Sequence, residues 1–162
     1  MVLLLATGYI WAFLFAPNDA QQGSMVKVMY IHVPCAWFAM MSYACMAGTS
    51  ALYLIWRLPL GYLLARAFGT VGISFTIVCL ITGSLWGIPT WGTWWVWDAR
   101  LTSVLILLFL YLGFFGLGQA FATPERSAKS AAIIALVGVV NLPIIKWSVE
   151  WWYTLHQPAS IM

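Results

Sequence analysis

The sequence predicts an all-α integral membrane protein, a polytopic helical bundle with five transmembrane helices. Of the 162 residues, 64% are hydrophobic and only 7% are charged, and the mean hydropathy is +0.93. A soluble domain carries about 25% charged residues, because it needs them to face water. Seven basic and four acidic side chains are too few to cover a globule of this size, so lipid is the expected solvent.

Five apolar segments are candidates for crossing, each of which takes roughly 20 residues in a bilayer. The first is short and ends at Pro17. The second begins with Pro34, since proline in the first turn of a helix loses no hydrogen bond. The fifth contains Asn141 and Pro143, which predict a kink. The expected spans are Val2–Ala16, Pro34–Trp56, Ala67–Ile88, Leu101–Ala122 and Ala131–Val149.

The basic residues predict an orientation, because lysine and arginine favour cytoplasmic loops. The loops after the second and fourth spans hold Arg57, Arg66, Arg126 and Lys129. The other side holds Lys27, Arg100 and Lys146. We therefore expect the first group in the cytoplasm and the chain end outside. An outside end after an odd number of spans suggests a shortened version of a longer protein. We expect one domain over residues 1–162.

Several functional classes are disfavoured. The scattered basic residues do not suggest nucleic acid. Cys35, Cys45 and Cys79 lack ligand spacing and are interpreted as reduced packing groups. Gly83 and Gly87 form a GxxxG step that is typical of contacts between membrane helices. The sequence contains no phosphate-binding glycine loop and no paired carboxylates, so we do not expect an enzyme.

The tryptophans are distributed unequally over the two sides. Trp56 is expected at the inner surface and Trp11 within the first span. An aromatic belt would occupy both interfaces. A one-sided cluster instead predicts a platform for a large, flat, apolar ligand, because each indole buries roughly 150–250 Å². Nine of the eleven are expected outside: Trp37, Trp86, Trp91, Trp94, Trp95, Trp97, Trp147, Trp151 and Trp152.

The two histidines are expected on the same side as these tryptophans. His32 precedes the second span and His156 follows the fifth. A single histidine near a membrane surface is more often an interface residue than a ligand. Two imidazoles flanking an indole cluster, however, indicate axial ligands for haem iron.

Charged groups on this side would complete the site. Arg100, Lys27 or Lys146 could meet the haem propionates, with arginine the best suited. Asp98 could orient Arg100 or cap the fourth span, and the two roles are compatible. Lys146 could instead pair with Glu150, four residues further along the helix.

The run Trp91–Arg100 closely resembles the WWD signature of the haem-handling proteins of cytochrome c biogenesis. The contexts His32-Val33-Pro34 and Leu155-His156-Gln157-Pro158 resemble the haem exporter protein C (CcmC-type) branch. The resemblance covers essentially the whole chain. It implies six spans, so the sixth would be absent here. It also implies haem b bound at the periplasmic face of the bacterial inner membrane. Carried over by position, His32 and His156 would be axial ligands, and the platform would comprise Trp91, Trp94, Trp95, Trp97, Asp98 and Arg100.

The resemblance also implies partners. Members of this family work beside ABC-type transporter subunits and a small membrane subunit, and they deliver haem to a periplasmic haem chaperone. Two alternatives to this function remain open from the sequence. The first is a haem-containing membrane electron-transfer subunit, although such proteins normally ligate haem within their spans. The second is a structural subunit with an aromatic belt.

Overall fold

The computed structural model describes residues 1–152 and residue 156. The described residues are helical apart from short connections, and they contain no β-strand beyond an isolated bridge between Asp19 and Gly23. The expectation of an all-α fold is therefore confirmed. In chain order the elements are α1 (Val2–Phe15), η1 (Ser24–Val28), α2 (Met29–Trp56), α3 (Pro59–Trp91), α4 (Ala99–Leu117), α5 (Pro124–Val137), η2 (Gly138–Val140) and α6 (Asn141–Trp151).

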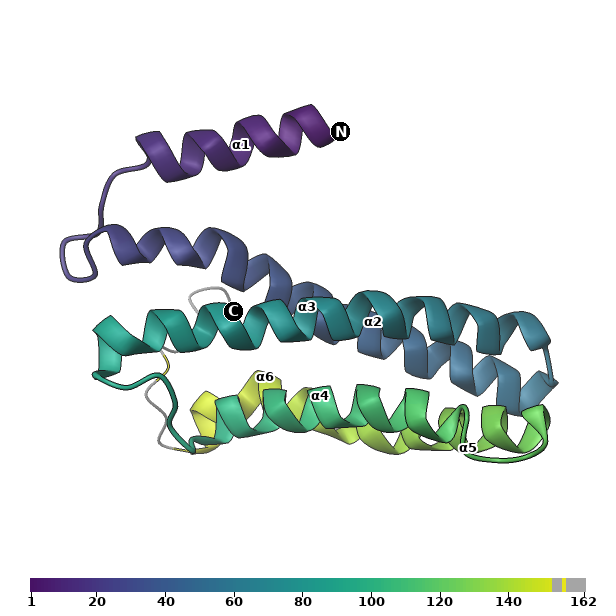
Figure 1. Cartoon of the computed structure of the whole chain (residues 1–162). Helices are drawn as coiled ribbons and strands as arrows, with labels where there is room; N and C mark the ends of the chain where they lie inside the picture. The colour runs from purple at the N-terminus through teal and green to yellow at the C-terminus, as the bar shows by residue number, and fades with distance from the viewer. Residues whose placement is uncertain (153–155, 157–162) are drawn as a thin grey trace.

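Four helical segments are long and apolar enough to cross a membrane, namely Ser24–Trp56, Pro59–Trp91, Ala99–Leu117 and Pro124–Trp151. The expected count of five is not confirmed, because α1 has only 14 residues. At 1.5 Å per residue it extends about 21 Å, whereas the hydrocarbon core is about 30 Å thick. Figure 1 shows α1 beside the first part of α2 only. The structure is that of a multi-pass membrane protein.

Three of the spans extend beyond the limits expected from hydropathy, whereas α4 ends at Leu117, short of the expected Ala122. Helix α2 begins at Met29, so Pro34 lies inside the helix and not in its first turn. Helix α2 is closed by Arg57, which adopts the left-handed conformation (φ 55°), and α3 begins at Pro59 after the intervening Leu58. Arg66 therefore belongs to a helix and not to a loop. Hydropathy finds the apolar centre of a span, whereas the helical hydrogen bonds continue through its polar ends.

The last expected span is one helical segment interrupted at the expected place. A short 3₁₀ turn, η2, separates α5 from α6, and Pro143 lies in the first turn of α6. Asn141 is buried at this interruption and donates from Nδ2 to the carbonyl of Ser103 on α4, at 2.9 Å. Because lipid offers no hydrogen bonds, this contact ties the break in one span to its neighbour.

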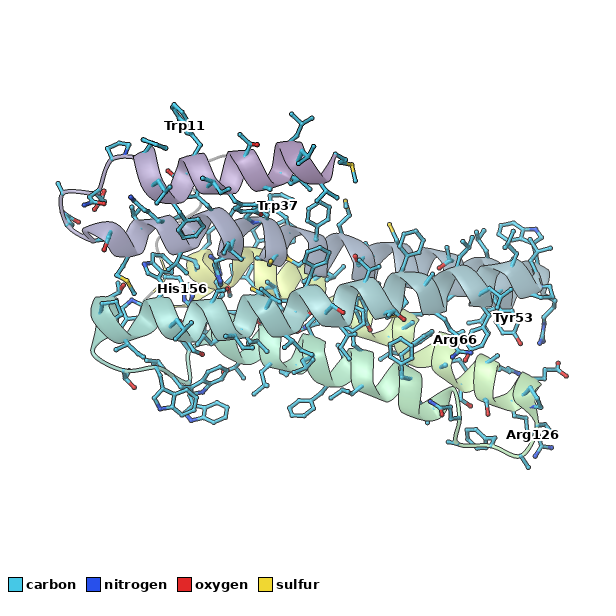
Figure 2. All side chains as sticks on the ribbon, turned by 45° about the horizontal axis from the view of Figure 1, so that its top comes forward. Trp11, Trp37, Tyr53, Arg66, Arg126 and His156 are labelled. Carbon is cyan, nitrogen blue, oxygen red and sulfur yellow. The ribbon has the colours of Figure 1, made fainter. Side chains whose placement is uncertain are left out.

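The connections group the basic residues at one end of the bundle. Arg57, which closes α2, lies 3.7 Å from Glu125 in the first turn of α5. The α2–α3 and α4–α5 connections therefore share an end, which we call the basic end. Figure 2 shows Arg66 and Arg126 there, and shows Trp37 and His156 toward the opposite end. The grouping expected from the sequence is confirmed, independently of which side of the membrane each end faces.

Aromatic side chains fill the interior between the helices. Tyr43, Tyr111 and Phe114 are fully buried, and the rings of the two tyrosines meet edge to face with centroids 5.0 Å apart. The Tyr111 hydroxyl donates to the carbonyl of Ala39 on α2 at 2.8 Å. This ring fits beside α3 because residue 72 is glycine, where a Cβ would collide with the Tyr111 hydroxyl.

Replacing Gly72 by alanine should therefore displace Tyr111 and break its hydrogen bond to Ala39. Overpacking and a lost buried hydrogen bond each cost about 1–3 kcal/mol in soluble proteins. We expect Gly72→Ala to lower the thermal unfolding temperature in detergent by several degrees. Gly116→Ala is the matched control, since nothing lies within 4 Å of a Cβ at that position. Equal stability of the two variants would contradict the packing described.

Candidate functional site

A cavity of about 310 Å³ lies between α2, α3, α4 and α6, away from the basic end. Small-molecule sites commonly have volumes of about 300–1,000 Å³. Apolar side chains supply most of the wall. The polar and aromatic groups that line it are His32, Trp37, Trp86, Arg100, Lys146 and His156. Both histidines of the chain thus reach one cavity, from parts of the sequence that are more than one hundred residues apart.

His32 lies in the first turn of α2 and is held by α3. Its Nδ1 is 3.0 Å from the hydroxyl oxygen of Thr82. The Thr82 hydroxyl donates its own hydrogen to the carbonyl of Val78 at 2.7 Å, so its oxygen can only accept from the imidazole. We therefore assign the proton of His32 to Nδ1, which leaves the lone pair of Nε2 available to a ligand.

His156 is held in a similar way by Asp98. Its Nδ1 lies 2.9 Å from Oδ2 of Asp98, which is itself buried. The other oxygen of Asp98 accepts from the backbone N–H of Leu101 at 2.7 Å and caps α4. Both roles considered for Asp98, cap and site residue, are therefore compatible with this geometry. A carboxylate on Nδ1 orients an imidazole and leaves Nε2 free.

Two cations reach the cavity from adjacent helices. Arg100 lies 3.4 Å from both the hydroxyl of Ser148 and the carbonyl of Lys146, which links α4 to α6. The ammonium of Lys146 lies 5.5 Å from the centre of the Trp37 ring, a cation–π arrangement. No ion pair between Lys146 and Glu150 occurs in the described part of the chain.

Lys27, the third cation considered, is not among the residues that line the cavity. Its ammonium donates to the carbonyl of Phe13 at 2.9 Å and so ties η1 to the end of α1. Its expected contact with a ligand is not supported by this placement.

Trp86 forms a wall of the cavity and is only 8% exposed. Its ring centre lies 6.2 Å from that of His32, and its Nε1 donates to the side-chain oxygen of Gln22 at 3.1 Å. Gln22 is held in turn by Asp19, whose carboxylate accepts from the backbone N–H groups of Gln22 and Gln21. These bonds hold the pKa of the Asp19 carboxyl below its ordinary value. Sequence reasoning missed Gln22, because its partner Trp86 lies 64 residues further along the chain.

The tryptophans of the expected platform fall into two groups. Trp91 lies beside Trp86, with ring centres 6.4 Å apart. Trp95 lies beside both Trp94 and Trp97, with ring centres 6.2 and 5.4 Å apart. Trp91 lies against His156, with ring centres 4.8 Å apart and edge to face. Trp94 and Trp95 instead line a separate shallow groove beside apolar residues of α3. Trp97 is 75% exposed. Of the six residues expected to form the platform, only Arg100 lines the cavity with the histidines. Trp91 and Asp98 do not line it, but both contact His156.

Of the two glycines of the GxxxG step, Gly83 lies at the contact between α3 and α2, where it faces His32, and Gly87 faces the loop that follows α3. A Cβ at Gly83 would lie 3.0 Å from Cε1 of His32. A Cβ at Gly87 would lie 3.0 Å from the ring of Trp91 and 3.1 Å from the carbonyl of Thr93. The small residues of α3 thus leave room for the imidazole and for the loop that follows the helix. The close backbone approach expected at this step is instead found elsewhere on α3, at Gly61.

The donor set agrees with iron held in a macrocycle. Among the described residues, no group of three or more His, Cys, Asp or Glu side chains could hold a metal ion. Two imidazoles are too few for a site built from protein ligands alone. Haem iron already has four ring nitrogens and needs only two axial ligands, which histidine commonly supplies. The residues present therefore fit haem.

The family described as Heme exporter protein C matches residues 1–162 of this sequence. The chain belongs to the heme exporter protein C family. It is 54% identical over 161 residues to Heme exporter protein C of Bradyrhizobium diazoefficiens, covering 99% of this chain and 61% of the relative. It is 50% identical to the protein of that name from Escherichia coli K12, covering 99% and 66%. The Haemophilus influenzae protein is 49% identical, at 99% and 65% coverage. The chain thus spans somewhat less than two thirds of these relatives.

Replacing the buried Trp86 and replacing the exposed Trp97 should affect the stability of this family member differently. Trp86→Ala removes a buried wall and leaves Gln22 without its donor, at a cost of about 3 kcal/mol by comparison with soluble cores. Trp97→Ala removes a ring that is mostly exposed and should change stability by less than about 0.5 kcal/mol. Thermal unfolding in detergent measures both. A larger loss for Trp97→Ala would mean that the loop packs differently.

Proposed function

We propose that this chain binds a haem at the periplasmic face of the inner membrane and passes it to a periplasmic haem chaperone during cytochrome c biogenesis. One observation carries the proposal: His32 and His156 line the same cavity, and each is held through Nδ1. This leaves both Nε2 atoms available as axial ligands. The name of the relatives, Heme exporter protein C, supports haem as the ligand.

The proposed ligand is haem b, bound without a covalent link so that it can be passed on. His32 and His156 would hold the iron of the bound haem, and other side chains of the cavity would hold its ring and propionates. Arg100 and Lys146 are the proposed partners of the propionates, because both are cations that line the cavity. Trp37 and Trp86 provide flat apolar wall. These residues bind and orient a ligand, and the protein acts as a delivery component without catalysing a reaction of its own.

The proposed orientation follows from the two ends of the bundle. The basic end carries Arg57, Arg66, Arg126 and Lys129 and would face the cytoplasm. The cavity would then open near the periplasmic surface. Because the described histidines lie near helix ends and not in the middle of the spans, a bound haem would be close to water and to soluble partners.

Exposed tryptophans at the cavity end support a contact with partners. Trp94 and Trp97 are 64% and 75% exposed, and they follow the end of α3. Exposed aromatic side chains beside a ligand site are typical of interaction surfaces. We propose that they meet the porphyrin or the chaperone during transfer. ABC-type transporter subunits and a small membrane subunit are the other proposed partners, and membrane lipid surrounds the helices.

Replacing either histidine tests the proposal. His32→Ala and His156→Ala should each abolish stoichiometric haem binding, because one axial bond and its buried support are lost. The visible spectrum of the purified protein measures the haem, and gel filtration verifies that the variants remain folded. Stoichiometric haem in both folded variants would overturn the proposal. Haem that stays bound but cycles rapidly with quinones would favour the electron-transfer alternative. A folded wild-type protein without affinity for haem would favour a structural subunit.

Replacing Trp94, Trp95 and Trp97 together by alanine tests the role of the loop. If these rings form part of the haem platform, the triple variant should lose haem more readily on dilution and still insert into the membrane. Retention measured by gel filtration, with membrane fractionation as the control, reports the two properties separately. Undiminished retention would confine the haem site to the cavity and leave the loop to the partner.

A further inference from the structure

We propose that Thr82 is a positioning residue for haem ligation: its hydroxyl accepts from Nδ1 of His32 and thereby fixes the tautomer and direction of that ligand. The inference rests on the proposed function, in which His32 binds the iron. Thr82 itself would not touch the haem. It is not among the residues that line the cavity, whereas His32 is.

The hydrogen bonds of Thr82 make its hydroxyl oxygen an acceptor, and not a donor, toward His32. Its hydroxyl lies 2.7 Å from the carbonyl of Val78 and 3.2 Å from that of Cys79, both in the preceding turn of α3. The single hydroxyl hydrogen is directed toward these carbonyls. The oxygen is then a pure acceptor toward His32, at 3.0 Å. To donate to this oxygen, the imidazole must carry its proton at Nδ1. A neutral imidazole with its proton at Nδ1 has its lone pair at Nε2.

The residues on either side of this contact hold the ring in place. A Cβ at Gly83 would lie 3.0 Å from Cε1 of His32, so the ring rests directly on the backbone of α3. Sγ of Cys79 lies 3.9 Å from the same Nδ1, on the preceding turn. Three residues of one helix therefore lie against the Nδ1–Cε1 edge of the imidazole, and the side chain lines the cavity.

The hydrogen bond between His32 and Thr82 corresponds to one between His156 and Asp98. His156 is supported by the carboxylate of Asp98, whereas His32 is supported by a neutral hydroxyl. Hydrogen bonding at Nδ1 raises the basicity of Nε2 toward a metal. Removing the Thr82 hydroxyl would lower that basicity and would also permit the other tautomer, which carries its proton at Nε2 and cannot bind iron through that nitrogen.

Thr82→Val removes the hydroxyl at nearly constant volume and tests the inference. Loss of an outer-shell partner commonly weakens metal binding by 10- to 100-fold, so we expect haem affinity to fall roughly tenfold. The reduction potential of the bound haem should move to a more positive value, because a less basic imidazole stabilises ferric iron less well. Thr82→Ser restores the acceptor and should restore both quantities.

Thr70→Val is the matched control. Thr70 also lies on α3, and its hydroxyl donates to the carbonyl of Arg66, one turn earlier, at 3.0 Å. Unlike Thr82, it has no hydrogen bond to either histidine in the described part of the chain. Its loss should leave haem affinity and potential unchanged. Wild-type values for both quantities in folded Thr82→Val would overturn the role of Thr82 while leaving haem binding intact. Unchanged haem binding in folded His32→Ala would instead overturn the proposed function itself.

Discussion

The hydrogen bonds that hold the two imidazoles through Nδ1 are the interactions on which the site depends. Without them each ring could rotate or change tautomer, and two histidines in a common cavity would not present two free nitrogens. Thr82 on α3 supplies one bond and Asp98 at the start of α4 supplies the other. The relative placement of α3 and α4 is therefore also the relative placement of the two proposed ligands.

Residues at helix ends stabilise the bundle and also position the groups that line the cavity. Asp98 caps α4 with one carboxylate oxygen and holds His156 with the other. Arg100, two residues later, links α4 to α6 and lines the cavity. Gln22, before η1, holds the indole of Trp86. In lipid, hydrogen bonds of this kind and close packing replace much of the hydrophobic drive for helix association. The polar groups that assemble the bundle at this end are thus largely those that form the site.

The fold class was predictable because lipid imposes a simple rule. Every crossing needs a long apolar helix, and a chain with so few charges has no other stable arrangement. The pairing of loops at the basic end followed from the same rule. Exact limits did not: α2 starts before Pro34 and α3 includes Arg66, whereas α4 ends at Leu117, before the expected Ala122. The status of Val2–Ala16 was the least predictable, since α1 is apolar but short.

The site was predictable in its composition and less so in its geometry. The two histidines and Arg100 were found because they are rare residues grouped on one side of a lipid-embedded chain. The tryptophans were too numerous to be sorted by the same argument, so the sequence could not distinguish the wall, Trp86, from Trp94 in a separate groove. Thr82 carried no signal, and Gly83 indicated only helix packing, as part of the GxxxG step. A threonine or glycine in a membrane helix ordinarily indicates packing, and only the position of His32 gives these two a further role.

Labelling of the histidines gives the most direct test of the central claim. The chain has only two, so uniform ¹⁵N-histidine labels His32 and His156 and nothing else. In the ferric haem complex of the purified protein, electron–nuclear double resonance would then count the labelled nitrogens bound to iron. Two labelled axial nitrogens on one low-spin iron are the result we predict. One labelled nitrogen, or none, would contradict a haem held between both histidines.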